Sequence, residues 1–129
     1  MRAKQVSVFA ENRPGRLGNV LSTLAEVGVD VRALAIADSA DFGIVRMILS
    51  DTTKGQAALK EAGFTLIVND VLAVEVPDVP GAFYKTIVAP LSAAGVNIEY
   101  VYAFAEHPQQ HALVVLKTTD LAKAEAIIG

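Results

Sequence analysis

The chain has 129 residues, the length of one ordinary domain or of two very small ones. Hydrophobic residues make up 53% and charged residues 19% of it, which excludes a disordered chain. The net charge of −3 argues against nucleic-acid binding, and the lack of cysteine excludes disulfides, a thiolate nucleophile and a cysteine metal site. No apolar run approaches the ~18 residues that span a membrane. We therefore expect a globular cytoplasmic protein with no membrane or nucleic-acid partner.

The first half of the chain alternates between strand and helix patterns. Residues 5–10 alternate in polarity like a strand, and residues 16–27 carry apolar side chains at helical spacing until Gly28, a typical helix end. Strand-like residues 29–37, a turn at 38–41, a strand at 42–49, a helix at 53–62 and a strand at 64–68 follow. This β-α-β-β-α-β order predicts a ferredoxin-like α+β fold.

The second half repeats most of this order. We expect a strand at 71–76, a turn at 77–81, a helix at 82–94, a strand at 96–104, a loop at 105–110, a strand at 111–117 and a helix at 120–128. No fourth strand follows, so either that strand is absent or another segment fills its edge of the sheet. The predicted domains are residues 1–69 and 70–129, packed side by side with antiparallel sheets.

Matching residues support a tandem repeat. Pro14-Gly15 returns 66 residues later as Pro80-Gly81, and Gly28 returns 67 residues later as Gly95. The segment 44–49 also aligns with a segment 67 residues later, 111–116. The second copy therefore has one extra residue in its first helix, which also contains Pro90. Proline removes a helical donor, so we expect a bulge or kink there.

The two Pro-Gly turns are the candidate sites. Each turn ends a strand and starts a helix, whose free N–H groups and dipole favour an anion such as a carboxylate. Asn12 and Asp78 stand at the strand ends, and Asp30 and Asn97 open the next strands, which we expect to lie close to the turns. A helix start that binds a carboxylate, with an acidic or amide side chain beside it for an ammonium group, suits a zwitterion. Each turn taken alone is also explained as a tight turn that caps a helix.

These residues make the chain resemble the ACT domain family, small β-α-β-β-α-β modules that bind amino acids and regulate enzymes of amino-acid metabolism. The resemblance covers both copies and is carried by the strand-end turns, the following helices and the segments 28–31 and 95–98. In that family the ligand lies where two modules pair. By position, the resemblance implies a first site of Asn12, Arg13, Pro14, Gly15, Arg16, Leu17, Asp30 and Val31. It implies a matching second site of Asp78, Val79, Pro80, Gly81, Ala82, Phe83, Asn97 and Ile98.

The functional prediction is an amino-acid sensor without catalysis of its own. The partners that the resemblance implies are a free amino acid, a second copy through sheet edges or helices, and an enzyme of amino-acid metabolism. No nucleophile elbow, phosphate loop or dinucleotide fingerprint is present, and we predict no cofactor and no metal. His107 and His111 have only Glu106 as a further candidate ligand, which favours a solvated loop. Two alternatives stay open: a ligand-free interaction module, and a small enzyme that uses Arg13 or Arg16.

Overall fold

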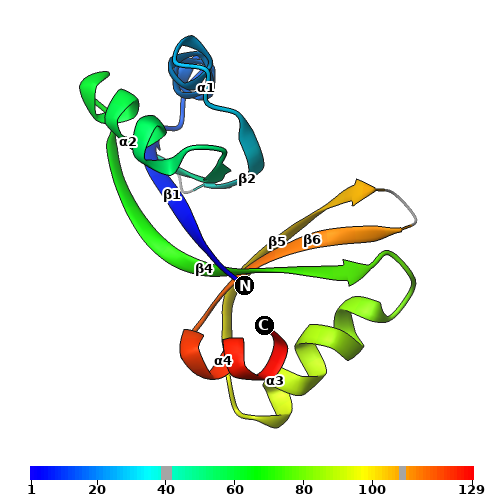
Figure 1. The fold of residues 1–129 in the computed structure, drawn as a ribbon. Helices are drawn as coiled ribbons and strands as arrows, with labels where there is room; N and C mark the ends of the chain where they lie inside the picture. The colour runs from blue at the N-terminus through cyan, green and yellow to red at the C-terminus, as the bar shows by residue number, and fades with distance from the viewer. Residues whose placement is uncertain (39–41, 108–109) are drawn as a thin grey trace. The chain divides into compact units, whose positions relative to one another are not determined.

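The structure, a computed structural model, describes residues 1–38, 42–107 and 110–129, without the side chains at 38 and 105–107. Residues 39–41 of the predicted turn and 108–109 of the predicted loop lie outside the described residues. Residue 38 and residues 105–107 belong to strands, so the predictions of a turn and a loop are wrong there. The chain forms two compact units, Lys4–Asn69 and Met1–Ala3 with Asp70–Gly129. Hydrogen bonds join six strands in the order β2-β3-β1-β4-β6-β5. Figure 1 shows the elements of each unit.

The unit Lys4–Asn69 contains the first repeat, in the predicted β-α-β-β-α-β order. Its elements are β1 (Arg2–Glu11), α1 (Arg16–Glu26), β2 (Val31–Asp38), β3 (Phe42–Leu49), α2 (Thr52–Glu61) and the first part of β4 (Thr65–Pro77). Strand β3 pairs antiparallel with both β1 and β2, so β3 separates these two strands. One face of the sheet packs under the two helices around a core that includes Val8, Leu24 and Met47.

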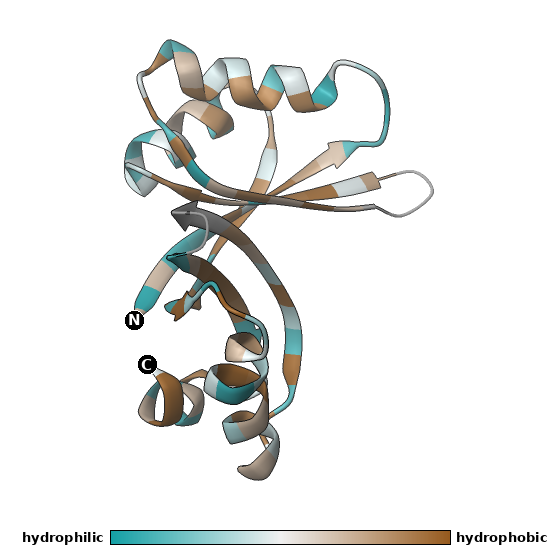
Figure 2. Cartoon of the chain, turned by 90° about the vertical axis from the view of Figure 1, so that its right-hand side faces the viewer, coloured by the Kyte–Doolittle hydropathy of each residue, from teal (hydrophilic) through white to brown (hydrophobic). Residues whose placement is uncertain are grey.

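The second unit contains the second repeat. After β4 come η1 (Tyr84–Val88), α3 (Ala89–Ala93), β5 (Ile98–His107), β6 (His111–Thr118) and α4 (Leu121–Ile128). Strand β6 pairs antiparallel with β4 and with β5. A separate core includes Leu72, Leu91 and Leu116. The helices of each unit carry apolar and hydrophilic residues along the same turns, as expected for helices with one buried side (Figure 2).

The start of the chain fills the edge that the second repeat leaves open. The Ala73 N–H donates to the Met1 carbonyl at 2.8 Å, and the Met1 ammonium donates to the Ala73 carbonyl at 3.4 Å. Arg2 fixes this segment, because its Nε lies 3.0 Å from Glu125 Oε1 and its guanidinium lies 3.7 Å from Asp70 Oδ2. Of the two expectations for this edge, the one in which another segment fills it is confirmed.

The extra residue beside Pro90 is accommodated by a turn of π-helix. This is η1, in which the helix closes with wider hydrogen bonds, and the Ala89 N–H reaches back to the Tyr84 carbonyl. Pro90 follows within the same continuous helix, where the wider turn of η1 accommodates a residue that cannot donate. A one-residue insertion in a helix is relieved by such a bulge, so the predicted irregularity is confirmed.

One alignment from the sequence is wrong. Ala10 pairs with Gly43 in the first repeat, and Val76 pairs with Ala112 in the second, so β3 and β6 match at an offset of 69 rather than 67. The two additional residues lie within β5, which spans ten residues where β2 spans eight and which shifts its register between Phe104 and His107. Side chains along a strand alternate with a period of two, so a shift by two residues keeps the same side chains facing the core. The apolar pattern alone fits both alignments.

The caps of α2 and α4 support the corrected offset and give a first prediction. Asp51 accepts a hydrogen bond from the Lys54 N–H, and Asp120 accepts one from the Lys123 N–H, each at 3.0 Å. We expect Asp51→Ala and Asp120→Ala each to lower the free energy of unfolding by about 1 kcal/mol, because each leaves a helix-start donor without its acceptor. Urea unfolding measures this. Asp→Asn at either position keeps an acceptor and is the matched control.

Candidate functional site

The two Pro-Gly turns have the same backbone geometry. Gly15 has φ of 89° and Gly81 has φ of 83°, a left-handed conformation that other residues rarely adopt. The Arg16 N–H donates to the Arg13 carbonyl at 3.4 Å, and the Ala82 N–H donates to the Val79 carbonyl at 3.2 Å. The repeat in the sequence therefore reflects a repeated turn, and each turn leads directly into a helix.

The first turn leaves the start of α1 without a side-chain cap. Gly15 is the N-cap residue and carries no acceptor, and no acidic residue lies in the first turn of the helix. The first N–H groups of a helix and its dipole favour a negative charge. The start of α1 is therefore electrostatically suited to an anion such as a carboxylate.

A hollow with a volume of about 100 Å³ lies beside this turn, entirely within the first unit. Four predicted site residues line it, namely Asn12, Arg13, Arg16 and Leu17. The sequence analysis missed its other residues, which are Ala10, Glu11, Ile36, Gly43 and Val45. Gly43 offered a signal, because a glycine inside a strand often marks a place where the backbone is closely approached. Pro14 and Gly15 form the exposed turn but do not line the hollow.

The charges near the hollow differ in how they are paired. Arg13 Nε lies 2.9 Å from Glu11 Oε2, so that guanidinium is already neutralised by a carboxylate. The Arg16 guanidinium lies over the Phe64 ring, 4.7 Å from its centroid, and its buried Nε has no hydrogen-bond partner. Within the described part of the chain, Arg16 makes no ion pair. Its positive charge is therefore held at the turn without a balancing carboxylate.

Asp30 and Val31 lie at the opposite end of the sheet from this turn. Val31 pairs with Leu49, whereas Ile36 pairs with Val45 near the hollow. Ile36 is five positions along the strand from Val31, a distance of roughly 17 Å at the usual rise. The expectation that Asp30 lies beside the turn of its own module is wrong. Strand β2 runs parallel to β1 with β3 between them, so the start of β2 lies at the end of the sheet where β1 begins.

The second repeat has the same arrangement. Asp78, Val79, Pro80 and Gly81 form the exposed turn after β4, and Ala82 and Phe83 begin the following helix. The Asp78 N–H donates to the Gln110 carbonyl at 3.0 Å. Asn97 and Ile98 lie at the start of β5, opposite this turn. A side-chain hydroxyl binds the backbone at the start of both β2 and β5. Ser50 Oγ accepts a hydrogen bond from the Asp30 N–H, and Thr119 Oγ1 accepts one from the Asn97 N–H.

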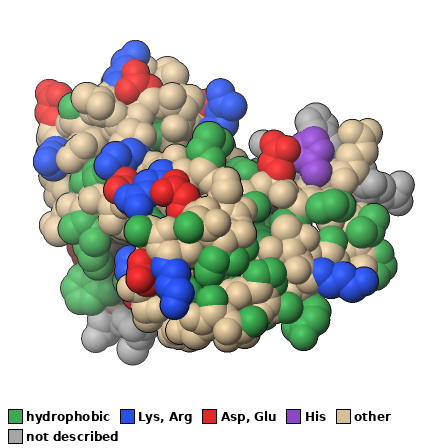
Figure 3. All heavy atoms as spheres, turned by 60° about the horizontal axis from the view of Figure 1, so that its bottom comes forward, with side chains coloured by type: hydrophobic (Ala, Val, Ile, Leu, Met, Phe, Trp, Pro, Cys, Tyr) green, Lys and Arg blue, Asp and Glu red, His purple; other side chains and the backbone are tan. Residues whose placement is uncertain are grey.

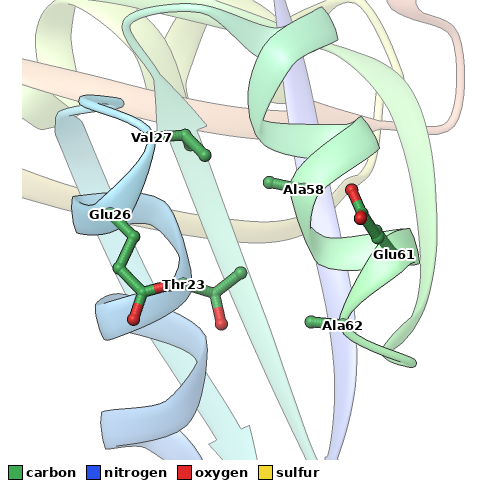
Figure 4. A pocket seen from close by; sticks show the side chains of 6 residues that line it. All are labelled: Thr23, Glu26, Val27, Ala58, Glu61 and Ala62. Carbon is green, nitrogen blue, oxygen red and sulfur yellow. The ribbon is translucent and has the colours of Figure 1, made fainter.

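A second hollow, of about 270 Å³, lies between α1 and α2 (Figure 4). It is lined by Thr23, Glu26, Val27, Ala58, Glu61 and Ala62, none of which is a predicted site residue. Its two carboxylates stand at the carboxyl ends of the two helices, where the helix dipole is negative. This hollow is larger than the one at the turn but is electrostatically unsuited to an anion.

Other surface features of the described residues are less distinctive. On the face drawn in Figure 3, basic and acidic side chains are interspersed with apolar ones. No group of three His, Cys, Asp or Glu residues is placed to hold a metal within the described parts of the chain. None of the described helices is long and apolar enough to cross a membrane. The side chains of Glu106 and His107, considered above as candidate ligands, are outside the described residues.

The fold and the paired turns define the class of protein, a tandem of ferredoxin-like modules in which each exposed Pro-Gly turn leads into a helix. The profile of the family described as "ACT domain pair" matches residues 1–129. The chain therefore belongs to the ACT domain pair family, and the predicted resemblance is confirmed.

Solved structures support this assignment. Protein BT0572 from Bacteroides thetaiotaomicron is 43% identical, with a TM-score of 0.92 over 98% of this chain and 86% of that one. The regulatory subunit of aspartate kinase from Thermus thermophilus is 17% identical, with a TM-score of 0.67 over 97% and 87% of the two chains. The corresponding subunit from Thermus flavus is 19% identical, with a TM-score of 0.65 and the same coverage. These last two likenesses concern the fold. No curated protein matches the chain.

Proposed function

We propose that this protein binds a free amino acid at the interface between ACT modules and regulates another protein without catalysis of its own. The observation that carries the proposal is the uncapped start of α1 beside a hollow, with the unpaired Arg16 charge next to it. The helix start and Arg16 attract the ligand carboxylate, and the hollow accepts its side chain. Membership of the ACT domain pair family supports the same ligand class.

The ammonium group of the ligand needs an acceptor from a second module. Asp30, the predicted acceptor, is at the far end of the sheet from the turn of its own module, and a small amino acid cannot span that distance. Its carboxylate is well exposed and lies 3.5 Å from Arg32. We propose that Asp30 of a second copy completes the site. A ligand held between two copies stabilises their association and so shifts any equilibrium that separates them.

The surface next to the hollow supports such pairing. Strand β2 is at the end of the hydrogen-bonded strand order, so one edge of it is unpaired in the described structure. Leu34 and Ile36 on this strand are 38% and 50% exposed. Apolar side chains on an edge strand favour pairing with another chain. In this proposal the output is a changed surface that an enzyme of amino-acid metabolism recognises.

The alternative is an interaction module that binds no ligand. Tyr84 is 63% exposed and Val79 is also exposed, so the second turn presents apolar side chains to solvent. Large exposed apolar side chains are typical of protein interfaces. This alternative predicts a partner protein whose binding does not depend on any amino acid.

A thermal-shift screen against the twenty amino acids at millimolar concentration separates the two. A metabolite sensor is expected to have a Kd of roughly 10 μM to 1 mM. At 100-fold excess over Kd the ligand stabilises the protein by about 2.7 kcal/mol, which raises the midpoint by several degrees. The control is protein unfolded and refolded to remove ligand carried through purification. No shift with any amino acid in that folded protein supports the interaction module instead.

A further inference from the structure

The two repeats differ at the residues that line the hollow beside the first turn. The corrected alignment places Val76 opposite Ala10, Phe83 opposite Leu17 and Ala112 opposite Gly43. At these three positions the second repeat has the larger side chain, and Phe83 and Ala112 pack against the core of their own unit. At Ile36 the second repeat has the smaller Ala103, so the space at the second turn differs in shape from the hollow at the first.

The charges at the two turns differ in the same direction. Arg16, which begins α1, is replaced by Ala82, which is buried, and Asn12 is replaced by Asp78. The first turn thus carries a guanidinium without a balancing carboxylate. The second turn has lost that cation and gained an acidic residue. A carboxylate ligand is therefore attracted more strongly to the first turn than to the second.

We infer that the two repeats are unequal, with one amino-acid site per chain at the first turn, where Arg16 selects the carboxylate and the hollow selects a short aliphatic side chain. This inference rests on the proposed function. The second repeat then acts as a structural partner that lacks this cation and this shape of hollow. The hollow is small, about 100 Å³, and its apolar residues Leu17, Ile36 and Val45 suit a branched aliphatic group.

Gly43→Ala tests the filling of the hollow. A Cβ at Gly43 would lie 3.9 Å from Ile36 Cγ2 and 3.8 Å from the Ala10 carbonyl, ordinary contact distances, so the fold should survive. We expect valine, leucine or isoleucine to bind wild type with one site per chain, and Gly43→Ala to weaken that binding ~10-fold or more. Ala112→Gly changes the matching residue of the second repeat and is the control, with unchanged affinity. Calorimetry gives both affinity and stoichiometry.

Arg16→Met tests the charge while keeping the aliphatic stem. Wild type is expected to prefer an amino acid over its carboxamide, which lacks the negative charge, and Arg16→Met is expected to lose this preference. Lys60→Met, which removes an exposed positive charge from α2, is the control and should keep it. A merely structural role for Arg16 would weaken both ligands equally and would overturn its assignment.

Three results would overturn the inference while leaving the proposed function intact. These are two amino acids bound per chain, tighter binding of aromatic than of aliphatic amino acids, and unchanged affinity in Gly43→Ala. Failure of wild type to bind any amino acid is a different result, because it removes the proposed function itself. Circular dichroism of each variant checks that a loss of binding is not a loss of folding.

Discussion

Replacing Leu24 with alanine is expected to lower the free energy of unfolding by about 2–5 kcal/mol. Leu24 is fully buried in the core of the first unit, and its removal leaves a cavity that the neighbouring side chains fill only in part. Leu91 stands at the matching position of the second repeat and is also fully buried. Leu91→Ala is therefore expected to have an effect of the same size, measured by urea unfolding.

The pair of variants also reports on how the two units unfold. If they unfold as one cooperative body, each variant shifts a single transition. If they unfold separately, Leu24→Ala moves one transition and Leu91→Ala moves the other. Ile67→Ala is the control, because this side chain is 53% exposed and its truncation should change the free energy of unfolding by less than ~1 kcal/mol. A loss below ~1 kcal/mol for either leucine would contradict the assigned cores.

Most elements of the fold could be predicted from the sequence because their signals are local. The glycines at 28 and 95 end helices, and the alternation of residues 5–10 marks a strand, whatever the rest of the chain does. The π-helical turn was also predictable, because one extra residue beside Pro90 has to be absorbed within a helix of otherwise matched length.

Features that depend on pairing between distant segments could not be predicted in the same way. The strand period of two hides a two-residue shift, which is why β6 was misaligned. The filling of the second sheet edge by Met1–Ala3 involves residues about 70 positions from Ala73, and no local pattern encodes that contact. The predicted domains divide between Asn69 and Asp70, and the structure places both residues within the continuous strand β4, a continuity that no local pattern encodes.

In the candidate site, too, the part that is local in sequence could be predicted and the part that depends on strand order could not. The turn residues Asn12, Arg13, Arg16 and Leu17 are close in sequence, and the structure brings them together around one hollow. The position of Asp30 depends on the order of strands, and the insertion of β3 between β1 and β2 moves it to the other end of the sheet. Ile36 and Gly43 enter the site from two further strands. Sequence spacing alone does not predict that residues from separate strands line the same hollow.

Mixing two defective variants is expected to restore ligand binding if the site is shared between copies. Gly15→Val damages the turn, because valine is strained at φ of 89° and its side chain blocks the approach to the start of α1. Asp30→Ala removes the acceptor for the ligand ammonium, and the loss of such a charge pair is expected to weaken binding by about 100-fold. Each variant alone should bind no amino acid at concentrations that saturate wild type.

In a mixed dimer one of the two sites combines the intact turn of one copy with the intact Asp30 of the other. Random pairing of equal amounts makes half of the dimers mixed, so about a quarter of the wild-type sites should return. Calorimetry on the mixture, after time for the copies to exchange, measures this fraction. A mixture of Gly15→Val with the double variant Gly15→Val/Asp30→Ala contains no intact turn and should restore nothing. No recovery in the first mixture, with mixed dimers detected by mass spectrometry, would show that Asp30 of a second copy does not complete the site.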